Sequence, residues 1–308
     1  MELLANAASL DEVALFYEAG ADALIVGHER YALRMPGSFE IEDIERAKQI
    51  ATRLNRKLYV AMNALFHQNM LDEIDVYIKK LREIGVDTIQ FGDPAVLMSL
   101  DQLSGDTGSL RMHWNTETTS TNYHTINFWA SKGVHRAVLA RELSLDDVLE
   151  IKRQTNIEIQ VLVHGMTCIF HSKRELVSNF ARYQGKAVTA ASFGLGRRLY
   201  VKEDKRDEQK YPIYEDVNGT HIMSYDDICM IEHLSMLITA GIDSLQIDTI
   251  LKSLEYSRAV IRIYREAIDF LRESPNAPSP AQWMEALKTL QPQDRPFSTG
   301  FYFKEQIY

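Results

Sequence analysis

Short apolar runs alternate with amphipathic stretches along the first 165 residues of the chain. The runs are rich in Val, Ile and Leu, which is typical of buried strands, whereas the stretches between them repeat apolar residues at helical spacing. The predicted strands are Glu2–Ala5, Asp22–Val26, Leu58–Met62, Asp87–Phe91, Leu110–Trp114, His135–Ala140 and Ile157–Val163. The predicted helices are Ser9–Ala19, Ile41–Leu54, Leu71–Ile84, a short helix after Pro94, Tyr123–Ser131 and Leu145–Thr155.

Three further elements follow later in the chain. Asp227–Ala240 has helical spacing, Ser244–Ile247 is the candidate for an eighth strand, and Tyr256–Leu271 supplies a covering helix. Strands that alternate with helices indicate a parallel sheet with right-handed crossovers. Eight such units in 308 residues favour an α/β fold closed as a TIM-like (β/α)8 barrel over an open sheet.

The alternation is interrupted between the seventh and eighth predicted strands. Residues 180–225 form a long segment rich in Gly, Tyr and charged residues, and connections of that length are usually lids or small subdomains. We therefore predict a barrel domain over residues 1–272 that contains this insertion. Residues 273–308 form a C-terminal extension with a Pro-containing linker, the helix Ala281–Leu290 and a polar tail.

Composition limits the class of protein. Apolar residues make up 45% of the chain, enough for a large core, and no run of 18 apolar residues predicts a membrane span. The N-terminus lacks the basic flank and apolar centre of a signal peptide, and two cysteines give no disulfide framework, so we expect a cytoplasmic protein. With a net charge of −9, the chain needs a local basic patch to bind nucleic acid.

Polar residues follow nearly every predicted strand. The carboxyl ends of barrel strands share one mouth, so these side chains are expected to converge there as the site. They are Asn6, His28, Glu29, Asn63, Asp93, Asn115, Glu117, Arg141, Glu142, His164 and Asp248. The alternative for any single position is that a polar residue simply begins a loop.

Within this set, His164 and Glu142 are the acid/base candidates, and Asp248 is a third catalytic candidate. A carboxylate beside Arg141 stays ionised, whereas a partly buried imidazole titrates near neutrality. Arg141 itself would pair with a substrate carboxylate, although Arg141 and Glu142 could equally form a salt bridge at the barrel rim. The candidates for other substrate contacts are Asn63, Asn115 and Glu117.

Cys168 follows His164 closely, and two chemical roles are open to it. As a nucleophile it would need His164 or His171 within hydrogen-bond reach. As a metal ligand it would be joined by Cys229 and at best by His171 and Glu175, since no C-x-x-C pair exists. A buried and inert thiol is the default.

Basic and aromatic residues cluster around the insertion. Arg197 and Arg198 are the candidates for holding phosphate groups, and the alternative is an ordinary solvated surface. The other basic residues are Lys173, Arg174, Lys202, Lys205 and Arg206, interleaved with Phe193, Tyr200, Tyr211 and Tyr214.

Sequence blocks along residues 1–270 resemble the U32 peptidase family, often called collagenase-like. Examples are GADALIVG, GVHRAVLARELSL, VLVHGMTCIFHSKRELVSN and YPIYEDVNGTHIMSYDDICMIEH. The resemblance implies a (β/α)8-like barrel. It also implies either peptidase activity or a part in hydroxylation, of wobble uridine in tRNA or of a quinone ring, by members that carry a [4Fe-4S] cluster on four cysteines. Chain length and the ARELSL and YEDVNGTHI blocks are most similar to the shorter of two tRNA-hydroxylation paralogues.

The chain departs from the family pattern at several positions. Cys168 and Cys229 match two of the four cluster cysteines, Glu175 stands at another, and residues 187–193 contain no thiol, so we expect no intact [4Fe-4S] cluster. Asn6 stands where relatives usually have Pro. Asp248 stands where they usually have Glu, which withdraws the carboxylate by about 1 Å.

Three functions are compatible with these residues and motifs. The first is a part in wobble-uridine 5-hydroxylation of tRNA, together with a cysteine-complete U32 paralogue. The second is a collagenase-like peptidase that uses His164 and Glu142, although no H-E-x-x-H or G-x-S-x-G motif is present. The third is a non-catalytic subunit of an active paralogue. The expected partners are tRNA and either a paralogous U32 chain or further copies of this one.

Overall fold

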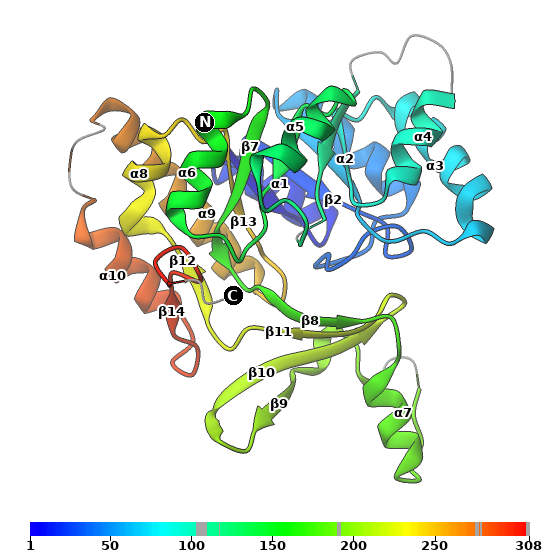
Figure 1. Cartoon of the computed structure of the whole chain (residues 1–308). Helices are drawn as coiled ribbons and strands as arrows, with labels where there is room; N and C mark the ends of the chain where they lie inside the picture. Colours follow the sequence, from blue (N-terminus) through cyan, green and yellow to red (C-terminus); the bar gives the residue numbers. More distant parts are fainter. Residues whose placement is uncertain (103–109, 117, 190–191, 275–276, 278, 306–308) are drawn as a thin grey trace.

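Eight parallel strands form the centre of the molecule. The computed structural model describes residues 1–102, 110–116, 118–189, 192–274, 277 and 279–305. In this part of the chain the strands run in the order β13-β1-β2-β3-β4-β5-β6-β7, and β13 also pairs with β7, which closes the barrel (Figure 1). The strands are β1 (Glu2–Asn6), β2 (Ala23–Val26), β3 (Lys57–Met62), β4 (Thr88–Phe91), β5 (Arg111–Trp114), β6 (Arg136–Val138), β7 (Glu158–Gly165) and β13 (Ser244–Ile247). The predicted TIM-like barrel is confirmed.

Helices cover the outside of the barrel. Alternate strand residues such as Leu3 and Leu24 are fully buried and join Phe16 and Ile44 of the helices in the main core. Side chains repeat on one face with a period of two in the strands and of 3.6 in the helices, so the apolar faces of both meet in this core. The helices of the first six units are α1 (Leu10–Glu18), α2 (Ile41–Arg53), α3 (Leu71–Ile84, after the short η1 Gln68–Met70), α4 (Pro94–Gln102), α5 (Tyr123–Ser131) and α6 (Leu145–Gln154). Helices α8 (Leu234–Thr239) and α9 (Leu254–Glu273) flank β13.

Polar side chains fill the amino-terminal end of the barrel interior. Glu2 contacts the Arg136 guanidinium and accepts hydrogen bonds from the Tyr59 hydroxyl at 2.6 Å and the Ser244 hydroxyl at 2.9 Å. Burial by itself raises the pKa of Glu2, but the positive charge of Arg136 outweighs it and leaves the pKa below its usual value. This satisfied network closes one end of the barrel and leaves the carboxyl ends of the strands as the place for a site.

The insertion between β7 and β13 forms a second sheet. It is antiparallel with the order β8-β11-β10-β9, and we call residues 168–223 the lid. Its elements are β8 (Cys168–Ser172), α7 (Leu176–Tyr183), η3 (Leu195–Arg197), β9 (Leu199–Glu203), β10 (Arg206–Asp216) and β11 (Gly219–Met223). Figure 1 shows the sheet across the end of the barrel from which β7 emerges. The lid begins at Cys168, before the predicted insertion start at residue 180, because β8 pairs with β11 rather than continuing as a loop.

The segment after the lid differs from its prediction. Residues 227–240 were expected to be one helix, but Asp227–Cys229 is strand β12, antiparallel to β7, and only after η4 (Ile231–His233) does helix α8 begin. The polar tail likewise contains a strand, β14 (Phe297–Ser298), which follows α10 (Ala281–Leu290) and pairs with β12. Tertiary partners therefore decided the conformation of both segments, in residues 227–229 against the local helical spacing.

Candidate functional site

Three of the predicted site residues meet at the barrel mouth. Asp248, immediately after β13, is 3% exposed. Its carboxylate accepts a hydrogen bond from the Asn6 amide at 3.4 Å and pairs with the Arg141 guanidinium at 3.4 Å. Since β1 and β13 are neighbours in the barrel, the residues that follow them are brought together although the chain separates them widely. Asp248 thus holds Arg141 and Asn6 at the mouth.

Two predicted asparagines lie at the same end of the barrel with different partners. The side-chain amide of Asn115 donates a hydrogen bond to the Gln90 side-chain oxygen at 3.0 Å inside the barrel. The side-chain oxygen of Asn63 instead accepts a hydrogen bond from the Leu33 backbone N–H at 2.8 Å. Asn63 therefore fixes the loop after β2, and Asn115 belongs to the inner wall. Glu117 lies outside the described residues.

The lid is fastened over the mouth at two places. The Asn218 amide, at the turn between β10 and β11, donates to the carbonyls of Glu29 at 2.8 Å and Ala32 at 3.2 Å in the loop after β2. A small apolar cluster then joins the lid residues Tyr214 and Met223 to Ile250, just beyond Asp248. The lid therefore contacts the loops that follow β2 and β13 at the barrel mouth.

Tyr214 is a site residue that the sequence pattern placed only in a basic and aromatic surface. It is 2% exposed, and its ring stacks on His221 at 4.7 Å. Within the described residues its hydroxyl has no hydrogen-bond partner. Burial is the main cause that raises the pKa of Tyr214, and the carboxylates of Asp216 and Asp248 add to it. This phenol therefore stays protonated and can donate a hydrogen bond beside Asp248. In the sequence, the alternation of apolar and polar residues in YPIYED was the signal that could have placed Tyr214 on the buried face of its strand.

His164 does not face the mouth. It is fully buried between β7 and α9, where its ring nitrogens hydrogen-bond with the hydroxyls of Tyr256 at 2.8 Å and Tyr264 at 3.3 Å. Phe297 packs against it as well. Burial lowers the pKa of His164 to about 3. The side chain therefore remains neutral at physiological pH, on the helix side of the barrel wall, because an irregular register between β7 and β13 redirects the end of the strand.

Three further charged candidates, Glu142, Arg197 and Arg198, are exposed. Glu142 follows β6 on the turn before α6, next to Arg141, and its side chain is exposed while Asp248 is buried. Arg197 ends η3 and Arg198 precedes β9, and both are exposed on the lid. The structure thus unites Arg141 with Asp248, and it places His164 in a separate environment.

The two cysteines occupy different surroundings. Cys229 is 3% exposed and lies opposite His164 in the antiparallel pair of β12 with β7. Burial raises the pKa of its thiol to about 11. Cys168 begins the lid, opposite Met223. Glu175 is exposed and forms a salt bridge with Arg182 at 3.2 Å. No group of three potential metal ligands gathers anywhere in the described ranges, and two thiols alone do not supply the ligands of a [4Fe-4S] cluster. The donor set does not fit the group that the family resemblance implies.

The chain is similar to one protein family and to several known proteins. The family model described as Peptidase family U32 matches residues 8–307. The chain is 46% identical to "tRNA hydroxylation protein P2" of Bacillus subtilis (strain 168), covering 100% of this chain and 99% of that protein. It is 29% identical to "tRNA hydroxylation protein P1" of the same organism, covering 100% of this chain and 73% of that protein. Among solved structures, "The Structure of the U32 Peptidase Mk0906" matches with a TM-score of 0.48 and 14% identity, covering 80% of this chain and 92% of that one.

Over the residues that the structure describes, no helix combines enough length with enough apolar character to cross a bilayer.

Proposed function

The chain belongs to peptidase family U32, and on that premise we propose that it takes part in tRNA hydroxylation together with a cysteine-complete paralogue. The observation that carries the proposal is the 46% identity to a tRNA hydroxylation protein over the full length of both chains. Bacillus subtilis contains two proteins of this name, P1 and P2, and both resemble this chain. The proposed target is C5 of the wobble uridine, and the proposed compartment is the cytoplasm.

The cysteine content supports a division of labour between paralogues. With only Cys168 and Cys229 at cluster positions, this chain does not supply a complete set of thiolate ligands. A partner that retains the full set would therefore carry the redox centre. In this proposal the present chain contributes substrate binding and orientation.

The barrel mouth is proposed to bind a small anionic substrate or the target base. Arg141 offers a fork of N–H donors suited to a carboxylate, and Asp248 orients it. Tyr214 would supply a further hydrogen bond from the lid. Exposed basic residues on the lid, Arg197 and Arg198 among them, would bind the RNA backbone and compensate locally for a net charge of −9.

Deletion of the gene in its own organism tests the proposal. We expect 5-hydroxyuridine and its derivatives in tRNA to fall, and the wild-type gene on a plasmid to restore them, as measured by mass spectrometry of digested tRNA. Arg141→Ala should restore much less, whereas Arg46→Ala, an exposed change on α2, serves as the matched control. Unchanged tRNA modification after deletion would contradict the proposal.

A further inference from the structure

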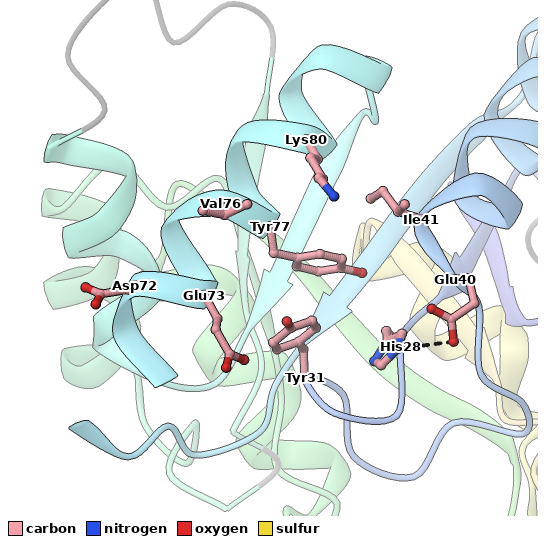
Figure 2. A pocket seen from close by; sticks show the side chains of 9 residues that line it. All are labelled: His28, Tyr31, Glu40, Ile41, Asp72, Glu73, Val76, Tyr77 and Lys80. Carbon is pink, nitrogen blue, oxygen red and sulfur yellow. Dashed lines mark ion pairs between the residues drawn. The ribbon is translucent and has the colours of Figure 1, made fainter. Parts of the chain in front are cut away.

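A groove lies beside the barrel mouth, outside the site described above. It has a volume of about 470 Å³, within the range of small-ligand pockets. Figure 2 shows it between the first turn of α2, the exposed side of α3 and the loop after β2. The lining side chains are His28, Tyr31, Glu40, Ile41, Asp72, Glu73, Val76, Tyr77 and Lys80. His28, predicted to lie in the mouth, is found here.

Two tyrosines form the inner wall of the groove. Tyr31 and Tyr77 stack with ring centroids 4.3 Å apart. Tyr77 is only 6% exposed, and its hydroxyl has no hydrogen-bond partner within the described residues. In Figure 2 this hydroxyl points from α3 across the groove towards Glu40 and Ile41. A buried hydroxyl without a partner is costly, so a ligand that completes its hydrogen bonding would be favoured there.

The charge of the groove is negative. His28 Nδ1 accepts a hydrogen bond from the Arg30 backbone N–H at 3.1 Å, and its Nε2 lies 3.3 Å from the Glu40 carboxylate. The Glu40 side chain is 69% exposed, so its carboxylate lies open to a cation that approaches from solvent. Glu73 is paired with Arg30 at 2.7 Å, whereas Asp72 is exposed in the first turn of α3. With Glu73 paired to Arg30, the carboxylates of Glu40 and Asp72 outnumber the single ammonium of Lys80 and repel phosphate groups, which argues against RNA as the occupant.

We propose that this groove is a docking site for an arginine side chain of a partner protein. The guanidinium group would pair with Glu40 and donate a hydrogen bond to the Tyr77 oxygen, while its aliphatic stem lies against the tyrosine rings. Val76, 57% exposed at the edge of the groove, would be covered by the surface that carries the arginine. A free polyamine would leave Val76 in water, so a protein is the better fit.

The position of the groove gives the contact a consequence. The loop that carries His28 and Tyr31 also provides the Glu29 and Ala32 carbonyls that anchor Asn218 of the lid. A partner bound in the groove therefore contacts the loop to which the lid is fastened. Lys80 lies eight residues beyond Asp72 on α3, about 12 Å along the helix. Its positive charge repels a cation that enters the groove from that end.

Titration of the full-length protein with blocked amino acids tests the proposal. N-acetyl-L-arginine amide is the probe, and N-acetyl-L-citrulline amide is a neutral control of nearly the same shape. We expect the arginine probe to bind with a Kd on the order of 1 mM by calorimetry and to shift the ring resonances of labelled Tyr31 and Tyr77. Glu40→Gln should weaken it about three- to fivefold, the effect of an exposed ion pair. Glu45→Gln, an exposed change on the same helix, should leave it unaltered.

Each possible result of these titrations either supports or overturns the docking site. Stronger binding of arginine than of citrulline, reduced by Glu40→Gln and increased by Lys80→Ala, supports the docking site. Equal binding of both probes, or no binding of arginine at tens of millimolar, overturns it. Spermidine that binds the groove at least tenfold more tightly than arginine would identify a polyamine site instead, and the protein partner would be rejected. None of these results depends on tRNA hydroxylation.

Discussion

Replacing Asp227 by Asn should destabilise the fold more than any surface change. Asp227 is fully buried at the start of β12. Its carboxylate contacts the Lys252 ammonium and accepts hydrogen bonds from the Arg295 guanidinium at 2.8 Å and the Gln291 amide at 2.5 Å. The cluster ties the C-terminal tail and the loop after β13 to the segment that leaves the lid.

The expected magnitude follows from the burial of the partners. In Asp227→Asn, Lys252 and Arg295 remain 5% and 9% exposed with no negative charge between them. Removing one partner from a buried ion pair costs about 3–5 kcal/mol, since the remaining charge has lost its solvation as well as its partner. We expect a loss of that size in the free energy of unfolding at pH 7. Asp294→Asn breaks an exposed pair with Lys210 and should cost less than about 1 kcal/mol.

The pH dependence gives an independent check. Burial alone would raise the pKa of Asp227, but Lys252 and Arg295 outweigh it and hold the pKa well below its usual value. A carboxyl group with a lowered folded-state pKa contributes stability above the unfolded value of about 3.9, and that contribution is lost as the pH falls through the folded value. The difference between wild type and Asp227→Asn should therefore narrow below about pH 4.

Urea unfolding at pH 7, 4 and 3 measures these differences. Circular dichroism and tryptophan fluorescence should give coincident transitions, which justifies a single free energy. Limited proteolysis should also cut the tail of Asp227→Asn near Arg295 sooner than that of the wild type. A loss below about 1 kcal/mol at pH 7, equal to that of the Asp294→Asn control, would show that the cluster does not hold the tail in place.

The other predictions concern the barrel wall and the mouth. Burial lowers the pKa of His164 to about 3, so between that pH and about 6.5 the unfolded chain binds more protons than the folded one. The free energy of unfolding should therefore decrease as the pH is lowered through this window. His164→Gln should make that dependence on pH less steep in urea titrations. Tyr214→Phe should reduce tRNA hydroxylation several-fold in a complementation assay, while the free energy of unfolding changes by less than about 1 kcal/mol. Tyr211→Phe, in the same strand, should leave hydroxylation intact. Full activity of Tyr214→Phe would exclude a hydrogen bond from its hydroxyl to the substrate. Arg141→Lys should fail to replace Arg141, since an ammonium lacks the planar fork that binds a carboxylate, and equal complementation by the two would remove the carboxylate-binding role.

Local patterns predicted the regular part of this fold. The helix over residues 71–84 ends at Gly85, whose φ of 75° lies in the left-handed region that glycine adopts without strain, as expected. Ser9 caps α1 with its side chain, again as the sequence indicates. Such signals are local, so a single chain carries them in full. The number and spacing of these units then favoured a closed barrel.

The candidate site was predicted less completely. Asp248 and Arg141 follow neighbouring parts of one barrel end, and their meeting is a consequence of strand topology that the alternation implied. The orientation of His164 was beyond prediction, because it depends on an irregular register between β7 and β13 that has no local signal. Tyr214 was missed as a mouth residue because the lid, not its own strand, positions it there.

The amino-acid sequence by itself determined the alternation of strands and helices, the barrel and the polar ends of its strands, since hydrophobic periodicity and caps act between near neighbours. Tertiary structure alone decided that Asp227–Cys229 joins the sheet beside β7, that the lid packs against Ile250, and that a groove opens between α2 and α3. These features depend on contacts between residues far apart in the chain, where burial and charge pairing outweigh local conformational preference.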